Sequence, residues 1–267
     1  MDVDLDDAMR AYYSLGKERD RLGSGVGYLE FLRTTEIVSR RLPSPPAVVA
    51  DIGGGPGRYA LWLASLGYEI EHRDLMSLHV SQLSAEGVAG INTAVGDARD
   101  IDLPDASVDA VLLLGPLYHL TGRADRLRAL SECARIARPG GPVFAAAITR
   151  WSARMDGVLK ARLYLEQPDM VALADEVERT GLMPPLFDGS FNGYCHRPAE
   201  LGEEVAAAGL PVESVLNVEG PAFLLSDLGE RLDDPADREI VLSTARAFEA
   251  VPELSGIGPH LLATAAA

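Results

Sequence analysis

The sequence has few cysteines and no long apolar run. Its two cysteines, Cys133 and Cys195, are far apart and form no paired-ligand spacing, which argues against a disulfide framework and a structural zinc site. No stretch approaches the roughly 20 apolar residues that cross a bilayer. The acidic first seven residues differ from a secretion signal, which begins with positive charge and an apolar stretch. We therefore expect a soluble cytoplasmic protein with no metal site and no membrane partner.

Positive charge is also scarce. Lys17 and Lys160 are the only lysines, and 24 basic residues face 40 acidic ones, which gives a net charge of -16. The basic residues gather into no stripe, so nucleic acid is not an expected partner. An acidic chain repels large anions, which favours a neutral or cationic substrate. Few lysines beside many arginines and alanines are typical of a GC-rich bacterial genome, so we expect a bacterial source.

The length of 267 residues suffices for one large core with a modest accessory layer. Helix-like spacing of apolar residues predicts helices over residues 4–42, with a bend at Gly23–Gly27. Strand and helix patterns then alternate. The predicted strands are 47–52, 68–72, 91–95, 108–114 and 143–148, and the predicted helices are 58–66, 77–85 and 124–137. This alternation predicts parallel strands with right-handed crossovers, and hence an open, doubly wound α/β sheet.

The regular alternation breaks over residues 149–193. This apolar stretch is predicted to form about two helices and a loop, and we interpret it as a helical lid over the active site. A helical layer that only extends the core is the other interpretation. A helix (198–208), a strand (212–218), a helical stretch (224–251) and a last strand (260–265) follow. The predicted parts are an N-terminal helical cap (1–46), a ligand-binding α/β domain (47–148 and 194–267) and the inserted lid (149–193).

A glycine-rich turn, Asp51–Gly57, follows a buried strand and opens a helix. Closely spaced glycines permit positive φ and let the backbone approach a ligand, and this position is typical of a nucleotide-type site. Gly55–Ala60 also fits the dinucleotide fingerprint, with Asp74 about 20 residues on as the ribose acid. However, Asp51 puts an acid before the glycines, which a pyrophosphate disfavours and a cationic methionyl group favours. The turn alone is therefore compatible with a dinucleotide and with a cofactor that carries a cationic methionyl group.

Two later strand ends carry further polar groups. The third strand ends in Gly96–Ala98, which places a carboxylate where it can accept a hydrogen bond from a base's exocyclic amine. The fourth ends in Leu114–His119, which brings an aromatic ring and an imidazole to the reacting end of the site. The turn before the fifth strand is Arg138–Gly141. With these features, residues 47–148 resemble the class I S-adenosylmethionine-dependent methyltransferases, specifically the group that acts on small molecules.

The resemblance implies a Rossmann-like, mostly parallel, seven-stranded sheet and S-adenosylmethionine (SAM) as cofactor. It also implies methyl transfer to a small molecule, which in a bacterium suggests specialised metabolism. The implied cofactor-binding residues are Asp51, Gly53, Gly54, Gly55, Asp74, Leu75, Asp97, Ala98, Leu114 and Gly115. Asp74 would hold the ribose hydroxyls and Asp97 the adenine. Because Asp74 follows a His-Arg pair rather than an apolar strand end, Glu69 or Glu71 is an alternative ribose ligand.

Methyl transfer from a sulfonium needs an aligned acceptor, and it needs a base only where the acceptor must lose a proton. The candidate catalytic residues are His119 and His196, whose side chains titrate near neutral pH, and Tyr118. Either histidine could instead only pack or bind backbone groups, and His72, His79 and His260 are interpreted as structural or exposed. Substrate-binding candidates, typical of an aromatic pocket for a small organic acceptor, are Tyr12, Tyr13, Arg21, Trp151 and Tyr194.

Three other functions are weighed against the methyltransferase. The same fold and cofactor could serve different chemistry, such as cyclisation of SAM. An NAD-dependent oxidoreductase also fits the glycine fingerprint. A non-catalytic binding module is disfavoured by the intact glycine turn, Asp74 and Asp97. The sequence does not fix the acceptor, the choice among N-, O- and C-methylation, or whether the chain forms a homodimer.

Overall fold

A computed structural model describes Tyr13 and residues 18–185 and 192–267. Among these residues, nine strands form one sheet in the order β3-β2-β1-β4-β5-β7-β6, with β9 also beside β5 and β8 beside β9. The strands are β1 (Val48–Ile52), β2 (Glu69–Asp74), β3 (Ile91–Val95), β4 (Ala110–Leu113), β5 (Pro142–Thr149), β6 (Leu182–Met183), β7 (Gly193–His196), β8 (Val212–Asn217) and β9 (His260–Ala266).

Seven of these strands make the core of the sheet. The strands β3, β2, β1, β4 and β5 pair in parallel, as their helical crossovers require, and β9 then runs antiparallel to both β5 and β8. The predicted doubly wound, mostly parallel sheet is therefore confirmed. The short strands β6 and β7 extend it, because β7 continues the edge of β5 at Ile148 and Thr149. They lie where the sequence predicted only loop and helix, since two to four residues show no periodicity.

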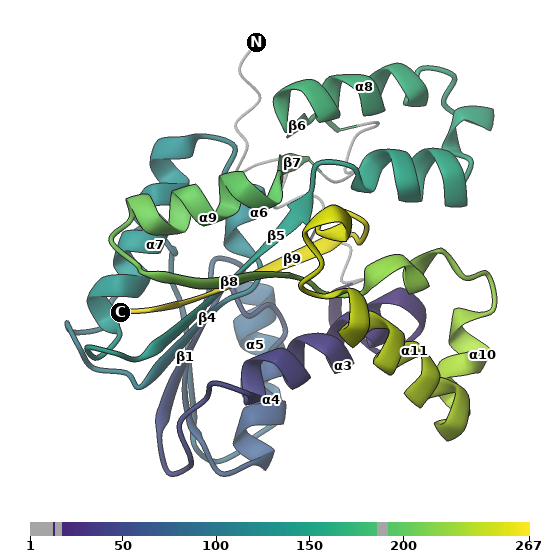
Figure 1. Ribbon diagram of the computed structural model, residues 1–267. Helices are drawn as coiled ribbons and strands as arrows, with labels where there is room; N and C mark the ends of the chain where they lie inside the picture. The colour runs from purple at the N-terminus through teal and green to yellow at the C-terminus, as the bar shows by residue number, and fades with distance from the viewer. Residues whose placement is uncertain (1–12, 14–17, 186–191) are drawn as a thin grey trace.

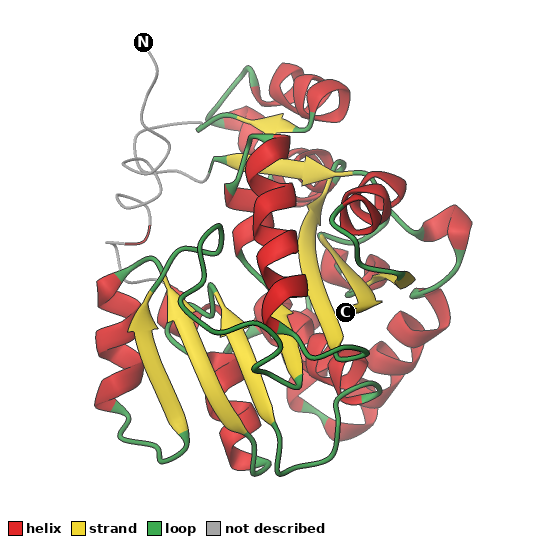
Figure 2. Ribbon diagram, turned by 90° about the vertical axis from the view of Figure 1, so that its left-hand side faces the viewer, coloured by secondary structure: helices red, strands yellow, loops and turns green. Residues whose placement is uncertain are grey.

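Helices cover both faces of the sheet (Figures 1 and 2). The helices are α2 (Glu18–Arg21), α3 (Gly25–Ser39), α4 (Arg58–Ser65), α5 (Ser77–Ala85), α6 (Pro116–His119), α7 (Arg123–Ile136), α8 (Met170–Thr180), α9 (Pro198–Ala207), α10 (Leu228–Asp233) and α11 (Pro235–Phe248). One face buries Val38, Leu63 and Leu83 of α3, α4 and α5. The other buries Cys133 of α7 and Val205 of α9.

The expected bend at Gly23–Gly27 is shorter than predicted, because α3 already begins at Gly25. Gly27 lies inside this helix, against the preceding one. A Cβ on Gly27 would lie 1.9 Å from the carbonyl oxygen of Arg21. The glycine thus serves a close approach of α3 to the end of α2, rather than a loose hinge.

The insertion after β5 forms its own layer. It contains a π-helix, η1 (Ala153–Lys160), a 3-10 turn, η2 (Leu163–Leu165), and α8. Met170, Ala174 and Val177 of α8 pack with Ala153 and with Cys195 of β7. Figure 1 places this layer beyond the carboxyl end of β5. Among the described residues no helix is long and apolar enough to cross a membrane.

A buried ionic network joins α7, α9 and β7. The Arg126 guanidinium donates to both carboxylate oxygens of Glu204 at 2.8 and 2.7 Å, and also to the carbonyl oxygens of Leu120 and Thr121. His196 lies 3.1 Å from the same carboxylate. Burial alone would raise the pKa of Glu204, but the hydrogen bonds from Arg126 and His196 outweigh it and lower this pKa to about 2. The network therefore fixes the loop that follows α6.

Replacing Glu204 should destabilise the fold, because Glu204→Gln leaves the Arg126 charge buried without a counterion. We expect a loss of about 3 kcal/mol in the free energy of unfolding at pH 7, measured by urea denaturation. The difference from wild type should shrink as pH falls from about 4.5 towards 2, because the wild-type carboxylate then takes up a proton. Glu203→Gln, at the exposed neighbouring position, is the control. Equal stability of the two variants at pH 7 would contradict the assignment.

Candidate active site

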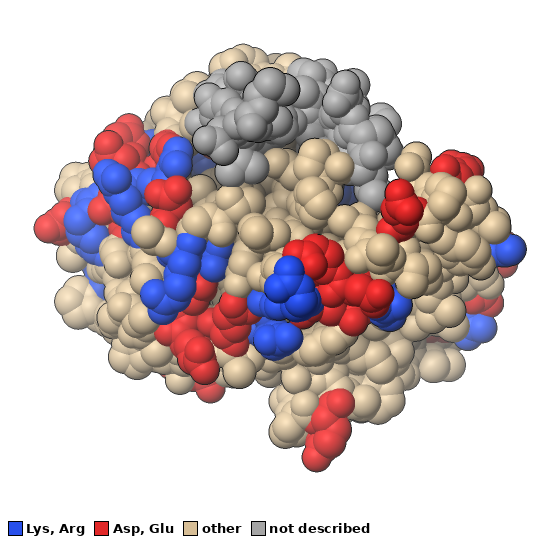
Figure 3. All heavy atoms as spheres, turned by 90° about the horizontal axis from the view of Figure 1, so that it is seen from above, with Lys and Arg blue, Asp and Glu red and all other residues tan. Residues whose placement is uncertain are grey.

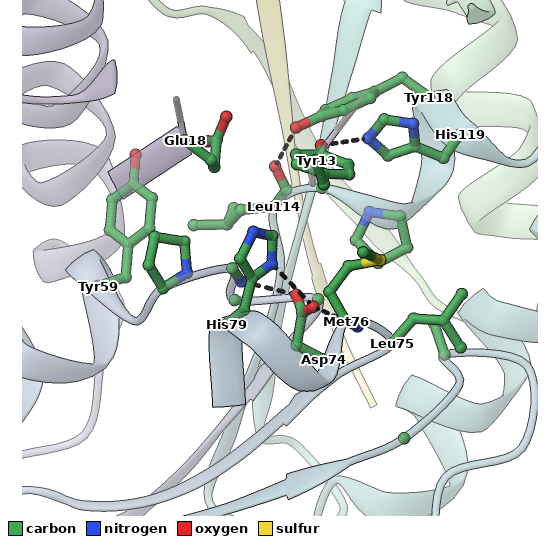
Figure 4. A pocket seen from close by; sticks show the side chains of 18 of the residues that line it. Tyr13, Glu18, Tyr59, Asp74, Leu75, Met76, His79, Leu114, Tyr118 and His119 are labelled. Atoms are coloured by element: carbon green, nitrogen blue, oxygen red, sulfur yellow. Dashed lines mark hydrogen bonds and ion pairs between the residues drawn. The ribbon is translucent and has the colours of Figure 1, made fainter. Parts of the chain in front are cut away.

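The carboxyl ends of β1, β2, β3 and β4 open into one pocket, the position where ligands bind in open parallel sheets (Figure 4). Tyr13 and residues of and next to α2 form one side of it. The described lining consists of Tyr13, Glu18, Arg21, Leu22, Gly53, Gly54, Gly55, Pro56, Arg58, Tyr59, Asp74, Leu75, Met76, His79, Gly96, Asp97, Ala98, Arg99, Leu114, Gly115, Pro116, Tyr118, His119 and Leu120. No described residue of the 149–193 insertion belongs to this lining, so its described part is a helical layer; a lid role stays a prediction.

The glycine turn after β1 exposes its backbone to the pocket. Gly53 has a φ of +68°, and a Cβ there would lie 2.4 Å from Cγ of Pro116 at the start of α6. Gly55 has a φ of +59°, and among the described residues its missing Cβ would meet only Cγ of Glu18, at 3.8 Å. The first glycine therefore lets two strand-end loops touch. The second leaves an open cradle in which a ligand can approach the main chain.

Asp51 lies beneath this turn rather than in the pocket lining. Its side chain is fully buried, and a Cβ on Gly54 would lie 2.4 Å from its Oδ2. Among the described residues neither carboxylate oxygen accepts a hydrogen bond of regular geometry, although the backbone N–H of Ala60 acts on the group and partly opposes the rise in its pKa. Burial and the nearby Asp74 carboxylate raise the pKa of Asp51 to about 7. The predicted direct contact of Asp51 with a ligand is thus not present in the lining, because Gly54 stands between.

Asp74, at the end of β2, holds the turn from the side. Its Oδ2 accepts a hydrogen bond from the backbone N–H of Gly55 at 2.8 Å. Its Oδ1 accepts one from the backbone N–H of Met76 at 2.8 Å and one from Nδ1 of the His79 ring at 3.0 Å. Burial opposes ionisation, but these hydrogen bonds and the His79 ring lower the pKa of Asp74. The alternative acids, Glu69 and Glu71, lie earlier on β2 and outside the pocket lining.

His72 holds the same turn from below. Its Nε2 lies 3.0 Å from the carbonyl oxygen of Gly55, and its Nδ1 lies 2.9 Å from Oγ1 of Thr93. Burial lowers the pKa of His72. Alternation along β2 puts His72 and Asp74 on one face of the strand, so the two side chains bind opposite sides of one glycine. That spacing was the available signal for a role of His72 at the site.

Asp97 lies at the opposite end of the lining and pairs with Arg99. The Arg99 guanidinium donates to Asp97 Oδ2 at 2.6 Å, and the Arg99 N–H donates to Oδ1 at 2.9 Å. Burial raises the pKa of Asp97, but these contacts outweigh it and lower it below its ordinary value. Ala98 beside it also lines the pocket. Arg99 was not foreseen from the sequence.

The loop after β4 supplies the polar groups at the remaining end (Figure 4). Tyr13 Oη lies 2.6 Å from His119 Nε2, and Tyr118 Oη donates to the carbonyl oxygen of Leu114 at 3.3 Å. Burial lowers the pKa of His119 to about 4, so the ring is neutral at pH 7. Arg21 donates to Glu18 at 2.6 Å. The structure thus brings three of the catalytic and substrate candidates, Tyr13, Tyr118 and His119, into contact or close proximity.

Three other candidates lie outside the pocket lining. His196 is fully buried on β7 against Glu204. The Tyr194 ring packs under the Arg126 guanidinium, 3.7 Å from the ring centroid. Trp151 lies against the 252–258 loop, since a Cβ on Gly256 would lie 2.3 Å from its ring.

The placement of these three residues corrects their predicted catalytic and substrate roles. Tyr194 and His196 lie on β7 and contact Glu200 and Glu204 of α9, whereas Trp151 lies against the C-terminal loop, so none of them reaches the described lining. Tyr12 lies outside the described residues.

The buried carboxyl group of Asp51 should make the free energy of unfolding depend on pH. Its folded-state pKa is about 7 against an ordinary 3.8, so the folded state binds more protons between those values and loses stability as pH rises through them. Asp51→Asn should remove this loss and exceed wild type at pH 8 by on the order of 2 kcal/mol in urea denaturation. The two proteins should converge as pH falls towards about 4, near the ordinary pKa of an aspartate. A variant no more stable than wild type at pH 8 would show that folding does not raise the pKa of Asp51.

Comparison with known proteins agrees with this geometry. Residues 50–145 match the family described as "Methyltransferase domain". Over 121 residues the chain is 35% identical to the ubiquinone/menaquinone biosynthesis C-methyltransferase UbiE of Acidiphilium cryptum (strain JF-5), covering 43% of this chain and 47% of that protein. The chain therefore spans about half the length of this relative.

Two solved structures share the fold. A SAM-dependent methyltransferase from Methanosarcina mazei has a TM-score of 0.58 at 16% identity and covers 86% of this chain and 96% of its own. The [4+2]-cyclase SpnF has a TM-score of 0.55 at 16% identity, and the match covers 88% of this chain and 79% of that protein. Residues 50–145 therefore match a methyltransferase domain, and the sheet order and the glycine turn give the chain the fold of the class I SAM-dependent methyltransferases, whose cofactor is SAM.

Proposed function

We propose that this protein transfers the methyl group of SAM to a small organic acceptor. The observation that carries the proposal is the single pocket that unites an open glycine turn, the strand-end acids Asp74 and Asp97, and the Tyr118–His119 pair. SAM carries hydrogen-bond donors at its adenine amine, ribose hydroxyls and ammonium group. The pocket offers carboxylate acceptors for them, and the cradle at Gly55 fits a ligand lying against the main chain.

Asp74 would hold the ribose and Asp97 the adenine, while the glycine turn and the buried Asp51 favour the cationic methionyl end. When bound, SAM supplies a methyl group already activated on a sulfonium. The protein's own residues then have to align the acceptor and exclude water. Tyr13, Tyr118 and His119 stand at the end of the pocket where they would do so.

The protonation state of His119 limits which chemical classes of acceptor the site suits. A neutral imidazole with a pKa of about 4 is a weak base, so it suits hydrogen bonding to an acceptor more than removal of a tightly held proton. We therefore favour an acceptor with an acidic hydroxyl or an activated ring carbon. The name of the UbiE relative, a C-methyltransferase of quinone biosynthesis, supports this class.

The charged surface also favours a small acceptor over a polyanion. On the face seen in Figure 3, basic side chains lie beside acidic ones, with broad uncharged areas between them. A nucleic acid needs a continuous basic track, so this face gives it little attraction. Bacterial specialised metabolism remains our proposal for the setting.

One alternative keeps the cofactor but not the methyl transfer. The likeness to the [4+2]-cyclase SpnF supports it, because that protein shares the fold. Incubating the purified protein with SAM and a panel of phenolic and quinol acceptors, followed by mass spectrometry, separates the two. A gain of one methyl group in an acceptor, with S-adenosylhomocysteine (SAH) formed in equal amount, supports the proposal. SAH binding without methylated product across acceptor classes favours the alternative.

The adenine-side role of Asp97 predicts a loss of cofactor affinity. Asp97→Ala should weaken SAH binding at least tenfold, because a charge-assisted hydrogen bond of roughly 1.5–3 kcal/mol disappears. Isothermal titration calorimetry measures this directly. Asp100→Asn, an exposed acid three residues away, is the matched control and should bind as wild type does. Unchanged affinity in Asp97→Ala would refute the role.

The neutral state of His119 can be checked without an acceptor. Burial lowers its pKa, so its ring should stay unprotonated until pH falls towards about 4. In an NMR titration, the imidazole C2–H signal that is absent from His119→Gln identifies this residue. A midpoint near the ordinary value of 6.5 would mean that the ring is solvated, and the preference for an acidic acceptor would lapse.

A further inference from the structure

His79 on α5 lines the pocket and has a buried ring nitrogen for which the described residues provide no hydrogen-bond partner. The side chain is only 2% exposed, and it belongs to the pocket lining. Its Nδ1 lies 3.0 Å from Asp74 Oδ1, whereas its Nε2 has no hydrogen-bond partner among the described residues. Figure 4 shows this second nitrogen pointing away from Asp74, on the side where Leu114 lies.

The contact with Asp74 fixes the role of each ring nitrogen. A carboxylate only accepts hydrogen bonds, so Nδ1 must carry the proton that lies between them. In the neutral ring Nε2 is then an acceptor. A buried acceptor without a partner costs free energy, and a ligand that donates to it recovers that cost. His79 is therefore prepared for a ligand's donor group.

The hydrogen bonds of Asp74 indicate which donor this is. A carboxylate has about four acceptor positions. Three of those on Asp74 are taken, by the N–H groups of Gly55 and Met76 and by the ring of His79. One position is left, while a ribose presents two neighbouring hydroxyl groups. Asp74 alone therefore has fewer unshared acceptor positions than the ribose has hydroxyl groups.

We propose that His79 Nε2 accepts a hydrogen bond from one ribose hydroxyl of the cofactor, so that Asp74 and His79 hold the ribose as a pair. This inference rests on the proposed binding of SAM and adds a ligand-contacting residue to it. The imidazole is held in place by Asp74 on one side and by the Tyr13 ring, 5.1 Å away and nearly perpendicular, on another. His79 thus meets the ligand in a fixed orientation.

The test combines variants of His79 with ligands that lack one hydroxyl. His79→Asn keeps an amide that can donate to Asp74 but has no atom at the Nε2 position, and His79→Phe keeps the ring volume but has neither nitrogen. Calorimetry measures the affinity of each for SAH, 2′-deoxy-SAH and 3′-deoxy-SAH. We expect both variants to bind SAH about tenfold more weakly than wild type. For one of the two deoxy ligands, the difference between variant and wild type should fall below about twofold.

The controls separate this inference from the proposed function. Ser81→Ala, an exposed position on the same helix, should bind all three ligands as wild type does. Circular dichroism and thermal unfolding show whether the His79 variants fold, and His79→Asn is the reference if His79→Phe does not. Equal losses for all three ligands would mean that His79 only supports Asp74, which overturns the inference alone. Failure of wild type to bind SAH overturns the cofactor assignment and the inference with it.

Discussion

The backbone of Gly55 is the point on which the site depends. Its N–H is bound by Asp74 and its carbonyl oxygen by His72, and both side chains come from β2. The turn belongs to β1, so the neighbouring strand, rather than the turn itself, fixes its shape. Glycine is needed there because the backbone has a positive φ and the missing Cβ leaves room for a ligand. A rigid cradle results from two hydrogen bonds and one absent side chain.

A second set of buried hydrogen bonds, made by Arg126 of α7, holds the loop that follows α6. Arg126 binds the carbonyl oxygens of Leu120 and Thr121, directly after the α6 turn that carries His119. Its charge is balanced by Glu204 on α9, so the last crossover helix supports a loop that follows the fourth strand. The polar end of the pocket is thus tied to the C-terminal half of the chain, although that half contributes no described lining residue.

Much of the fold could be predicted because its signals are local. The bounds of β3 and α5 agree with the predicted ones, since apolar periodicity and flanking glycines mark them. Strand-end acids could also be named, because parallel strands share one edge. His196 and Trp151 could not be placed, since a residue after β5 can turn towards the pocket or towards α9, and packing decides. His79 was interpreted only as structural or exposed, because its contact with Asp74 depends on how the chain turns from β2 into α5.

The two cysteines lie in separate parts of the interior. Cys133 of α7 belongs to the main core, whereas Cys195 of β7 packs with the helices inserted after β5. Burial raises the pKa of each thiol to about 12, so neither forms the reactive thiolate while its surroundings stay closed. A thiol reagent can therefore modify each one only when its own layer opens. The chain carries two built-in reporters that distinguish opening of the inserted layer from opening of the sheet beneath it.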